Sequence, residues 1–399
     1  MPVALLQIQA VGEQDIYLTK TPQINIFKYV YYRYHNFARE IQSLHLNEVA
    51  SFGKKTTVNV PFRGHMLSKI FLQLKLPALQ KINGDYACWS DVLGYSIFDG
   101  SIDLELNGVI IDRLFPECLD FVSELEVLDQ NFNKTILKSD VYRSVMYNAQ
   151  KETELMIPLS FWFTKHYSSA LPLMSMYGHE EVKIHFALKS FDTLIHYDGT
   201  APPVKRDIVD SNLIVEYLYL DSDLVKTLQA EPHLYIIEQT VSSIEESIDS
   251  AIGQYNSPLV FENVCKEIFF ALIEKDNVDN NNHFNYSRVD NGESIISEAS
   301  LVLDGKHIFG DFKDESIFRT VLPGITHPKI TDKFIYTIPF CIKSNLQQPT
   351  GGLNLSRFHD VTLSLKLKED NNNCFLRVYA IVYNVLQIKD GRITFEYNY

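Results

Sequence analysis

One run of strand-like segments occurs twice along this sequence. Ile102–Gly108 (IDLELNG) ends in an Asn-Gly pair and Ala299–Gly305 (ASLVLDG) ends in an Asp-Gly pair, and both dipeptides favour tight hairpin turns. Three further pairs follow in the same order: Leu155–Phe161 with Ile335–Cys341, Glu181–Leu188 with Asp360–Leu367, and Leu213–Leu220 with Leu376–Leu386. The members of a pair lie roughly 160 to 200 residues apart, whereas solenoid repeats are about 20 to 50 residues long. The sequence therefore predicts one tandem duplication of a whole domain.

Residue content and turn spacing predict that each copy is a β-sandwich. The chain has 399 residues, enough for two ordinary domains, and its 25 Phe and 22 Tyr favour strands. Apolar residues at helical spacing are rare in this sequence. They occur in Arg113–Leu128, and Phe312–Leu322 occupies the position of this segment in the second copy. We therefore expect an all-β fold of two tandem jelly-roll β-sandwiches, a double jelly roll. Each would have about eight antiparallel strands, with short helices in the connecting loops.

The two copies meet at a short charged stretch near the middle of the chain. Leu213–Leu220 reads as the last strand of the first copy, and His233–Gln239 as the first strand of the second. The expected domains are an N-terminal arm at 1–24, the first jelly roll at 25–221, a connector at 222–232 and the second jelly roll at 233–399. Because the connector is short, we expect it to be helical and to hold the two domains side by side with little freedom.

The first residues are expected to form an arm and not a core. The arm contains a polar, turn-like segment, Gly12–Gln23, which we expect to lie against other structure. Ile26–Ala38 (IFKYVYYRYHNFA) is basic and aromatic, and such a segment can stack nucleic acid bases. The alternative is a partly buried strand or turn in which Lys28 and Arg33 keep their charged ends in water. The net charge of −14 favours the second interpretation.

Charge balance and cysteine content narrow the classes of function. Thirty-six Lys and Arg stand against 50 Asp and Glu, a balance that repels nucleic acid in general. The five cysteines are scattered without a CxxC pair, which favours reduced thiols in a cytosolic compartment over a disulfide framework. The longest apolar run, Ile268–Ile273, is far shorter than the roughly 18 residues that span a bilayer. Met1–Gly12 lacks a basic n-region, so no signal peptide is expected.

No catalytic or cofactor-binding pattern is complete in the sequence. There is no GxSxG elbow, no HExxH pair and no full phosphate loop. Gly53–Thr56 (GKKT) has no glycine-rich turn before it, so we interpret it as a basic loop that leads into a strand. His179 and His185 would share one face of a strand, but about 20 Å would separate them, too far to hold one metal ion.

Polar clusters in the second half have simpler explanations than a site. Asp276–His283 (DNVDNNNH) lacks the glycine and terminal glutamate of a calcium loop, and a solvated loop tip explains it better. Glu245 and Glu246 are expected to lie on an exposed face. Asn-x-Ser/Thr sequons occur at Asn133, Asn285 and Asn354. We attribute them to chance, because no secretory signal is expected. We therefore predict no catalytic, cofactor-binding or metal-binding residue and no cofactor, and a protein that works by binding or assembling.

Segments spread from the first residues to the last match one viral family in order. The longest are Leu5–Lys28 (LLQIQAVGEQDIYLTKTPQINIFK) and Phe161–Ile184 (FWFTKHYSSALPLMSMYGHEEVKI). Shorter matches are Tyr217–Asp221 (YLYLD), Tyr235–Gln239 (YIIEQ), Gln348–Gly351 (QPTG), Asn354–Phe358 (NLSRF) and Tyr379–Leu386 (YAIVYNVL). Through these residues the chain resembles the major capsid proteins of nucleocytoplasmic large DNA viruses, the iridovirus and phycodnavirus type.

The resemblance implies a structural protein and not an enzyme. It implies a double jelly roll that forms a homotrimer, a capsomer whose six similar barrels fit hexagonal positions in an icosahedral shell. The implied partners are other copies of the chain, neighbouring trimers, minor capsid proteins, a penton protein and an inner membrane near residues 1–24, without sequence-specific nucleic acid. The implied locations are the virion capsid and, during assembly, the host cytoplasm. A flexible insertion near Lys226 is then expected to impair assembly before folding.

Two features depart from the family pattern. Arg63-Gly64-His65 stands where the family has an acidic residue after Arg-Gly, and the chain is short for the family. These departures leave room for a capsid scaffold or a minor capsid paralogue. A carbohydrate-binding or carbohydrate-processing β-sandwich is a third alternative, supported by aromatic and acidic residues in loops. Presence in purified virions would separate a shell protein from a scaffold, and glycan binding without trimers would favour the third.

Overall fold

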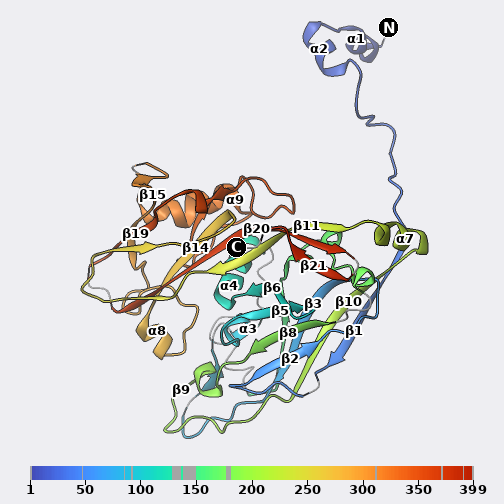
Figure 1. The fold of residues 1–399 in the computed structure, drawn as a ribbon. Coiled ribbons are helices and arrows are strands. Elements are labelled where there is room, and N and C mark those ends of the chain that lie inside the picture. Colours follow the sequence, from blue (N-terminus) through green and yellow to red (C-terminus); the bar gives the residue numbers. More distant parts are fainter. Residues whose placement is uncertain are drawn as a thin grey trace. The chain divides into compact units, whose positions relative to one another are not determined.

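The computed structural model describes residues 2–46, 48–84, 86–90, 93–127, 136–137, 150–176, 181–310, 312–369, 372–389 and 391–397. They belong to two compact units, Met1–Asn36 and Phe37–Tyr399. Figure 1 shows that the larger unit is built mainly of strands, with short helices between them. The larger unit therefore contains both halves of the predicted duplication.

The smaller unit contains two short helices, α1 (Val3–Gln9) and α2 (Glu13–Thr19). Every residue described in this unit is exposed. Asp15 caps α2, because its Oδ2 accepts the Gly12 backbone N–H at 2.9 Å. The turn-like segment predicted at Gly12–Gln23 was therefore wrong, since this cap starts a helix.

Ile26–Ala38 is more exposed than the sequence predicted. Phe27 is 97% exposed and Tyr32 is 90% exposed. The partly buried strand or turn was a wrong prediction, because the backbone joins a sheet only from Phe37 and so the preceding aromatic residues have no pleated surface to pack on. None of the described helices is long and apolar enough to cross a membrane.

The first sandwich consists of two antiparallel four-stranded sheets. One has the order β1 (Phe37–His45), β10 (Asp210–Leu220), β3 (Met66–Leu76) and β7 (Thr153–Pro158). The other has the order β2 (Lys55–Asn59), β8 (Val182–Ala187), β5 (Ile102–Leu106) and β6 (Val109–Leu114). A short extra pair joins β4 (Ala87–Trp89) to β9 (Ile195–Tyr197). Ranked along the chain without that pair, the strands have the orders 1-8-3-6 and 2-7-4-5, which is a jelly roll.

The second sandwich repeats these orders. One sheet has β11 (His233–Ser242), β20 (Cys374–Lys389), β14 (Val264–Glu274) and β17 (Tyr336–Pro339). The other has β13 (Gln254–Pro258), β19 (Val361–Leu367), β15 (Ile296–Leu303) and β16 (Lys306–His307). Three short strands extend the first of these sheets: β12 (Glu246–Ile248), β18 (Leu353–Asn354) and β21 (Arg392–Phe395). The orders are again 1-8-3-6 and 2-7-4-5, so the predicted double jelly roll is confirmed.

The duplication extends to a turn in each half. The hairpin after β5 has Asn107 at φ 50° and Gly108 at φ 83°, and the hairpin after β15 has Asp304 at φ 46° and Gly305 at φ 78°. Positive φ at both central residues gives the hairpin turn whose twist matches the flanking strands. The Asn-Gly and Asp-Gly pairs found in the sequence therefore make the same turn twice.

The helices lie in the loops, as expected. The helix predicted within Arg113–Leu128 is α4 (Pro116–Glu126), and the corresponding slot in the second half holds a π-helical turn, η5 (Ile317–Val321), that continues into α9 (Leu322–Thr326). The connector forms α7 (Ser222–Ala230). The other short helices are α3 (Leu93–Ser96), η1 (Trp162–Thr164), η2 (Tyr167–Ser169), η3 (Leu173–Ser175), η4 (Phe191–Leu194), α8 (Lys275–Asp279) and η6 (Leu355–Arg357).

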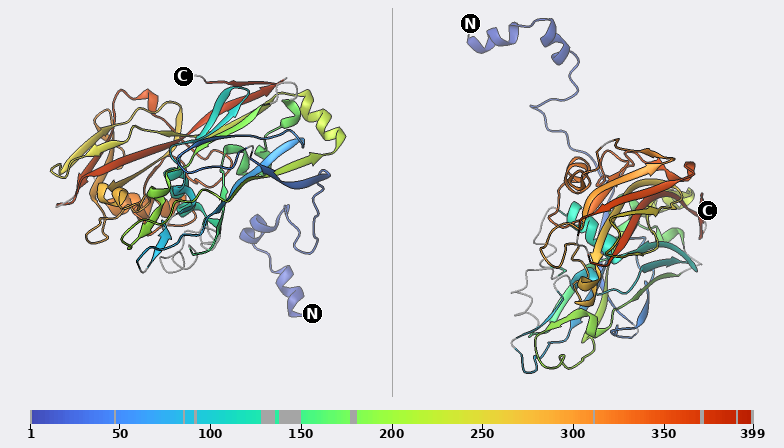
Figure 2. Two further views of the ribbon diagram at one scale, coloured as in Figure 1. Left: turned by 90° about the horizontal axis from the view of Figure 1, so that it is seen from below. Right: turned by 90° about the vertical axis from the view of Figure 1, so that its left-hand side faces the viewer.

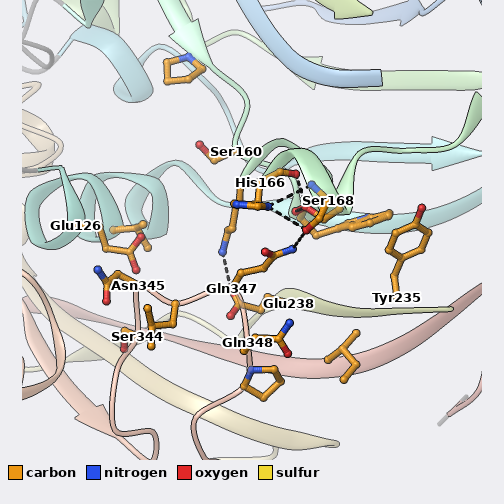
Figure 3. Close-up of a pocket in the computed structure, with 18 of the residues that line it drawn as sticks. Glu126, Ser160, His166, Ser168, Tyr235, Glu238, Ser344, Asn345, Gln347 and Gln348 are labelled. Carbon is orange, nitrogen blue, oxygen red and sulfur yellow. Dashed lines mark hydrogen bonds and ion pairs between the residues drawn. The ribbon is translucent and has the colours of Figure 1, made fainter. Parts of the chain in front are cut away.

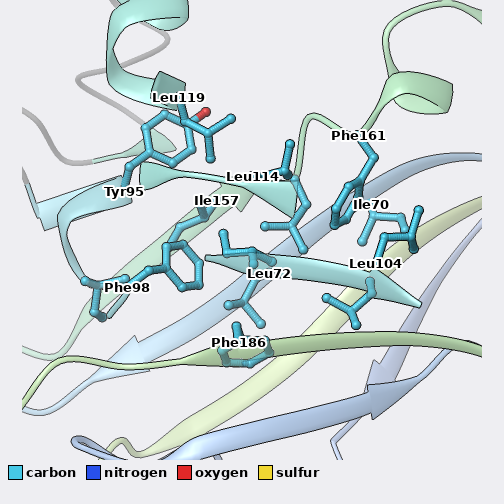
Figure 4. Close-up of a cluster of buried hydrophobic side chains, with 14 of the residues drawn as sticks. Ile70, Leu72, Tyr95, Phe98, Leu104, Leu114, Leu119, Ile157, Phe161 and Phe186 are labelled. Carbon is cyan, nitrogen blue, oxygen red and sulfur yellow. The ribbon is translucent and has the colours of Figure 1, made fainter. Parts of the chain in front are cut away.

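One hydrophobic cluster fills the first sandwich and continues into the second. Figure 4 shows Leu72, Leu104 and Phe186 meeting between the sheets of the first sandwich. The same cluster includes Leu386 and Ile388 at the end of β20, the long strand that runs from the second sandwich toward the first (Figure 2). A second cluster fills the interior of the second sandwich alone. The two sandwiches are therefore joined by a packed core as well as by the connector.

Candidate functional site at the junction of the sandwiches

Helix α4 of the first sandwich is the central element of this junction. Pro116 stands at its start, where a missing N–H costs nothing, and apolar residues recur along one side. Phe121 on that side is fully buried. Its ring packs on three rings of the second sandwich, with centroids 6.1 Å from Phe269, 5.4 Å from Tyr286 and 6.0 Å from Tyr379. The two sandwiches therefore share one aromatic centre.

A row of carboxylates on α4 meets cations from the second sandwich. Glu117, Asp120 and Glu124 are spaced three and four residues apart, so they lie along one side of the helix. Arg377 Nη1 lies 2.8 Å from Glu117 Oε1. Lys333 Nζ lies 2.7 Å from Asp120 Oδ1 and 3.2 Å from Glu124 Oε1. Charge on the first sandwich is thus neutralised by charge on the second.

Asp120 is the most deeply buried acid of this row, with its side chain 5% exposed. Burial raises the pKa of Asp120 to about 6, although the Lys333 ammonium lowers it. Burial also acts to lower the pKa of Lys333, but the carboxylates of Asp120 and Glu124 outweigh this and raise it. A buried pair of this kind is costly to break, because removing one partner leaves the other charge uncompensated.

A second ionic group crosses the junction at Glu238 of β11. Glu238 Oε2 lies 2.5 Å from Lys165 Nζ of the first sandwich, and its Oε1 lies 2.5 Å from Lys266 Nζ of β14. The Lys266 side chain is 2% exposed and also donates to the Ser344 carbonyl at 2.6 Å. Burial acts to raise the pKa of Glu238, but the two lysines overcome this and hold it at about 2. Glu238 therefore stays charged and ties the sandwiches together.

A histidine, a glutamate and a serine meet beside this group without forming a catalytic set. His327 Nε2 lies 3.0 Å from Glu267 Oε2, and Ser344 Oγ donates to that same oxygen at 2.7 Å. The serine hydroxyl is thus bonded to the acid and not to the histidine, which is the wrong order for nucleophilic catalysis. The side chains of His327 and Glu267 are both 0% exposed, so a substrate has no access to them.

A cavity of about 680 Å³ lies where the sandwiches meet (Figure 3). Trp162 and His166 of the first sandwich line it, together with Tyr235 and Gln347 of the second. His166 Nδ1 lies 2.9 Å from Ser168 Oγ and also accepts the Ser168 backbone N–H at 3.2 Å, so it caps a local turn. Gln347 Nε2 donates to the same hydroxyl from the other side. These polar groups therefore bridge the two sandwiches.

Residues weighed as ligands from the sequence are dispersed over the fold. His185 Nδ1 lies 2.8 Å from Thr57 Oγ1, and its Nε2 lies 2.9 Å from Glu105 Oε2, so it ties three strands of one sheet. His179 falls outside the described residues. Gly53, at φ 73°, makes the turn into β2, as predicted for a strand-leading loop. Within the described ranges, no three His, Cys, Asp or Glu side chains are placed to hold a metal ion.

Asp276–His283 is not a solvated loop tip, so that prediction was wrong. Part of it forms helix α8, and His283 is only 8% exposed. Asn281 Nδ2 donates to the carbonyls of Asp192 and Ile195 in the first sandwich, both at 3.0 Å. Asn277 Nδ2 of the same run donates to the carbonyls of Asn285 and Ser287 in its own sandwich, so these amide side chains satisfy backbone carbonyls and do not lie free in water.

The remaining polar positions mostly have structural partners. Glu245 is exposed, as expected, but lies 2.6 Å from Arg377 Nε, whereas Glu246 is partly buried and accepts from Ser257 Oγ at 2.7 Å. Of the sequons, Asn285 is exposed, Asn354 Oδ1 caps η6, and Asn133 falls outside the described residues. The five cysteines are free and buried, in agreement with the prediction of reduced thiols.

The helical spacing of Arg113–Leu128 predicts α4 but not its role at the junction. The signal was present, because the helical pattern carries Glu117, Asp120 and Glu124 at spacings that share a side. Their partners Lys333 and Arg377 lie more than two hundred positions further along the chain, and no local pattern connects them.

Known proteins resemble this chain along nearly its whole length. Residues 25–221 match the family described as "Major capsid protein N-terminus", and residues 225–394 match that described as "Large eukaryotic DNA virus major capsid protein". The major capsid protein of Pyramimonas orientalis virus is 27% identical, with 97% of both chains covered. That of Paramecium bursaria Chlorella virus 1 is 26% identical, with 98% of both covered.

Solved structures agree on the fold. A chain of the "PBCV-1 virus capsid, quasi-atomic model" superposes with a TM-score of 0.80 at 22% identity, covering 94% of this chain and 100% of that one. The "Faustovirus major capsid protein" gives 0.74 at 12% identity, covering 97% and 96%. The duplicated jelly roll, its packed junction and both family matches lead to one conclusion. This chain belongs to the family of major capsid proteins of large eukaryotic DNA viruses, which are structural components of the virion capsid and not enzymes.

Proposed function

We propose that three copies of this chain form a capsomer of pseudo-hexagonal outline, which tiles the icosahedral shell of a large double-stranded DNA virus. The observation that carries the proposal is that one chain holds two sandwiches with identical strand orders. Three such chains present six similar sandwiches, and head-to-tail contacts around a three-fold axis close a ring. Such a ring fits a position with six neighbours.

A tiling unit needs a fixed angle between its two sandwiches, and the packed junction supports this requirement. The aromatic centre at Phe121 and the ion pairs of Asp120 and Glu238 join the sandwiches at separate points. The connector α7 contributes little, because it has no buried residue. Its Gln229 makes one hydrogen bond, to the Met174 carbonyl at 3.0 Å. The angle is therefore set by the junction and not by the length of the connector.

The departure at Arg63-Gly64-His65 gives no support to a different role. A Cβ on Gly64 would lie 2.7 Å from Tyr217 Cβ, so the glycine is required by close packing. His65 Nδ1 accepts the Leu220 backbone N–H at 2.8 Å, which holds the end of β10. The histidine that replaces the family's acid thus has a structural task inside the first sandwich.

The proposed arrangement also specifies domains and partners. Residues 1–24 would be an arm, 25–221 and 233–399 the two jelly rolls, and 222–232 the connector. Neighbouring trimers, minor capsid proteins and a penton protein would contact the capsomer, with an inner membrane near the arm and assembly in the host cytoplasm. Exposed apolar residues in the arm, such as Val3 at 71% and Ile8 at 72%, support a partner there.

Electron microscopy and native mass measurement of the isolated protein test the proposal. At micromolar concentration we expect a species three times the 45.9 kDa of one chain, and class averages with six similar densities around a three-fold axis. A protein that stays monomeric under these conditions, or that forms only two-fold dimers, contradicts it.

A further inference from the structure

A shared irregularity aligns the two sandwiches residue by residue. Both carry one extra residue in the third strand, where the pairing with the eighth strand shifts register, at Ser68 and Lys266. With these residues matched, Phe71 of β3 corresponds to Phe269 of β14. Their cross-strand partners, Ile214 of β10 and Tyr379 of β20, correspond as well. All four side chains point away from the interior of their own sandwich.

These equivalent faces differ in what covers them. Phe269 and Tyr379 lie beneath α4 of the first sandwich and belong to the cluster that crosses the junction. The corresponding face of the first sandwich is uncovered at its edge, where Ile41 of β1 is 70% exposed. We call Ile41, Phe71, Met156 and Ile214 the open sheet face. Phe71, Met156 and Ile214 are half-buried. Polar residues stand between these apolar ones on the same side of the sheet, since Ile41 pairs with Glu216, Glu216 with Lys69, and Met156 with Gln73.

The helices that follow the fifth strand of each sandwich differ in the opposite way: the one in the first half is covered, and the one in the second half is not. In the first half, α4 is covered by the second sandwich. In the second half, η5 and α9 bury Phe318 against their own sandwich and leave the other side uncovered. Val321 is 49% exposed and Ile325 is 59% exposed, one helical turn apart. We call these two residues the helix stripe.

We propose that the helix stripe of one copy packs on the open sheet face of the next copy. Within the chain, the helix of the first half covers the sheet face of the second. The two surfaces that have no partner of this kind within the chain are the helix of the second half and the sheet face of the first half. Figure 1 shows them on different sandwiches. A head-to-tail ring of three copies repeats one kind of contact six times, three within chains and three between them.

This contact rests on the proposed trimer and identifies the surfaces that build it. Its chemistry differs from that of the junction. In α4, three carboxylates meet Arg377 and Lys333 of the second sandwich. In the second half, Glu315 just before η5 pairs with Arg319 of η5 at 3.6 Å, so this acid has its partner in the same helical segment. The exposed side of the second helix is left with apolar groups, which gain stability when they are buried against the apolar side chains of the open sheet face.

Charged substitutions on each surface test the contact. Ile325→Glu and Ile41→Glu place a charge on an exposed side chain, so each monomer keeps its fold, checked by circular dichroism. We expect each variant to raise the trimer dissociation constant by about 100-fold or more, because each places a charge where two apolar side chains would otherwise be buried against each other. Val260→Glu is the matched control, since Val260 is 84% exposed in the second sandwich and outside both surfaces. It should assemble like the wild type.

Mixing the two variants tests whether the surfaces bind each other. The Ile325→Glu chain keeps an intact sheet face, and the Ile41→Glu chain keeps an intact helix stripe. Their mixture should form heterodimers through one native contact, at concentrations where each variant alone is monomeric. Native mass spectrometry with one chain isotope-labelled reads this out.

The outcomes separate the inference from the proposed function. A wild type that remains monomeric overturns both. If the wild type forms trimers and Ile325→Glu or Ile41→Glu forms them equally well, the proposed contact is overturned but the proposed trimer is not. Two monomeric variants that give no heterodimer on mixing also overturn the contact, because each surface would then have some other partner.

Discussion

Helix α4 and the η5–α9 helix occupy the same place in two copies of one fold, between the fifth and sixth strands, yet they have opposite surfaces. α4 is covered, and its acids meet Lys333 and Arg377. The η5–α9 helix is uncovered, and Val321 and Ile325 face outward. Duplication thus allowed one helix to specialise in a permanent contact inside the chain. The other retains a surface suited to a contact between chains.

The largest effect is expected from the aromatic centre of α4. Phe121→Ala removes a fully buried ring that contacts the second sandwich, and we expect a loss of about 3–5 kcal/mol in the free energy of unfolding. Urea unfolding should also separate into two steps, because the junction no longer couples the sandwiches.

Phe318→Ala is the matched change in the second helix. Phe318 is equally buried but packs on Phe270 of its own sandwich, so only the second sandwich should be destabilised. Identical effects of the two variants on the first sandwich would argue against the difference between the helices.

Removing Lys333, the cation that pairs with Asp120 and Glu124 of α4, should lower the free energy of unfolding by the next largest amount. Lys333→Met leaves Asp120 buried without its partner, and we expect a cost of about 3 kcal/mol at pH 8. Loss of the cation raises the pKa of Asp120 further above about 6, so the carboxyl protonates and the deficit shrinks as the pH falls toward 5. Denaturant titrations at both pH values measure this.

The control for Lys333 lies on the second helix. Arg319 pairs with Glu315 at 3.6 Å on a partly exposed surface, so Arg319→Met should cost less than about 1 kcal/mol at either pH. A deficit for Lys333→Met that grows at low pH would show that Asp120 is not the group left unpaired.

Replacing a buried acid that precedes α4 should have a smaller effect, and it should raise the free energy of unfolding instead of lowering it. Asp112 in β6 is 3% exposed, and burial raises its pKa from 3.8 to about 7. Because the folded-state value is the higher one, ionising Asp112 costs stability as the pH rises between these values. We expect Asp112→Asn to be more stable than the wild type at pH 8 by about 2 kcal/mol, and to lose that advantage near pH 4. Thermal unfolding at the two pH values decides this, and an advantage only at low pH contradicts it.

The smallest effect is expected at the connector. The sequence suggested that a flexible insertion near Lys226 impairs assembly, because a short connector would fix the angle. We expect α4 and its partners to fix the angle instead, since α7 has no fully buried residue. A Gly-Ser insertion there should change the free energy of unfolding by less than about 0.5 kcal/mol and leave capsomers unchanged in electron micrographs. Loss of capsomers with an intact fold would restore the earlier expectation.

Elements with strong local signals could be predicted from the sequence. β5 and β15 show both strand alternation and turn dipeptides, and α4 shows helical spacing. β1 was missed because Phe37–His45 (FAREIQSLH) is polar and exposed at an edge, without a clear alternation. α2 was missed because its cap depends on Asp15 reaching back to Gly12, in a segment rich in polar residues.

The junction could not be predicted, because it depends on residues that only the fold brings together. Asp120 and Lys333 are 213 positions apart, and Glu117 and Arg377 are 260 apart. The prediction for the Asn-rich run ending at His283 was wrong for the same reason, since the carbonyl partners of Asn281 belong to the other sandwich. Local pattern shows which side of an element is polar, but not whether water or another domain satisfies it.

A density map of the assembled protein at side-chain resolution tests the central claim most directly. We expect a three-fold ring in which α9 of each copy lies on β1, β10 and β3 of the next, with Ile325 against Ile41, Phe71 or Ile214. A ring in which the open sheet face is solvated, or in which α9 faces outward, would contradict it.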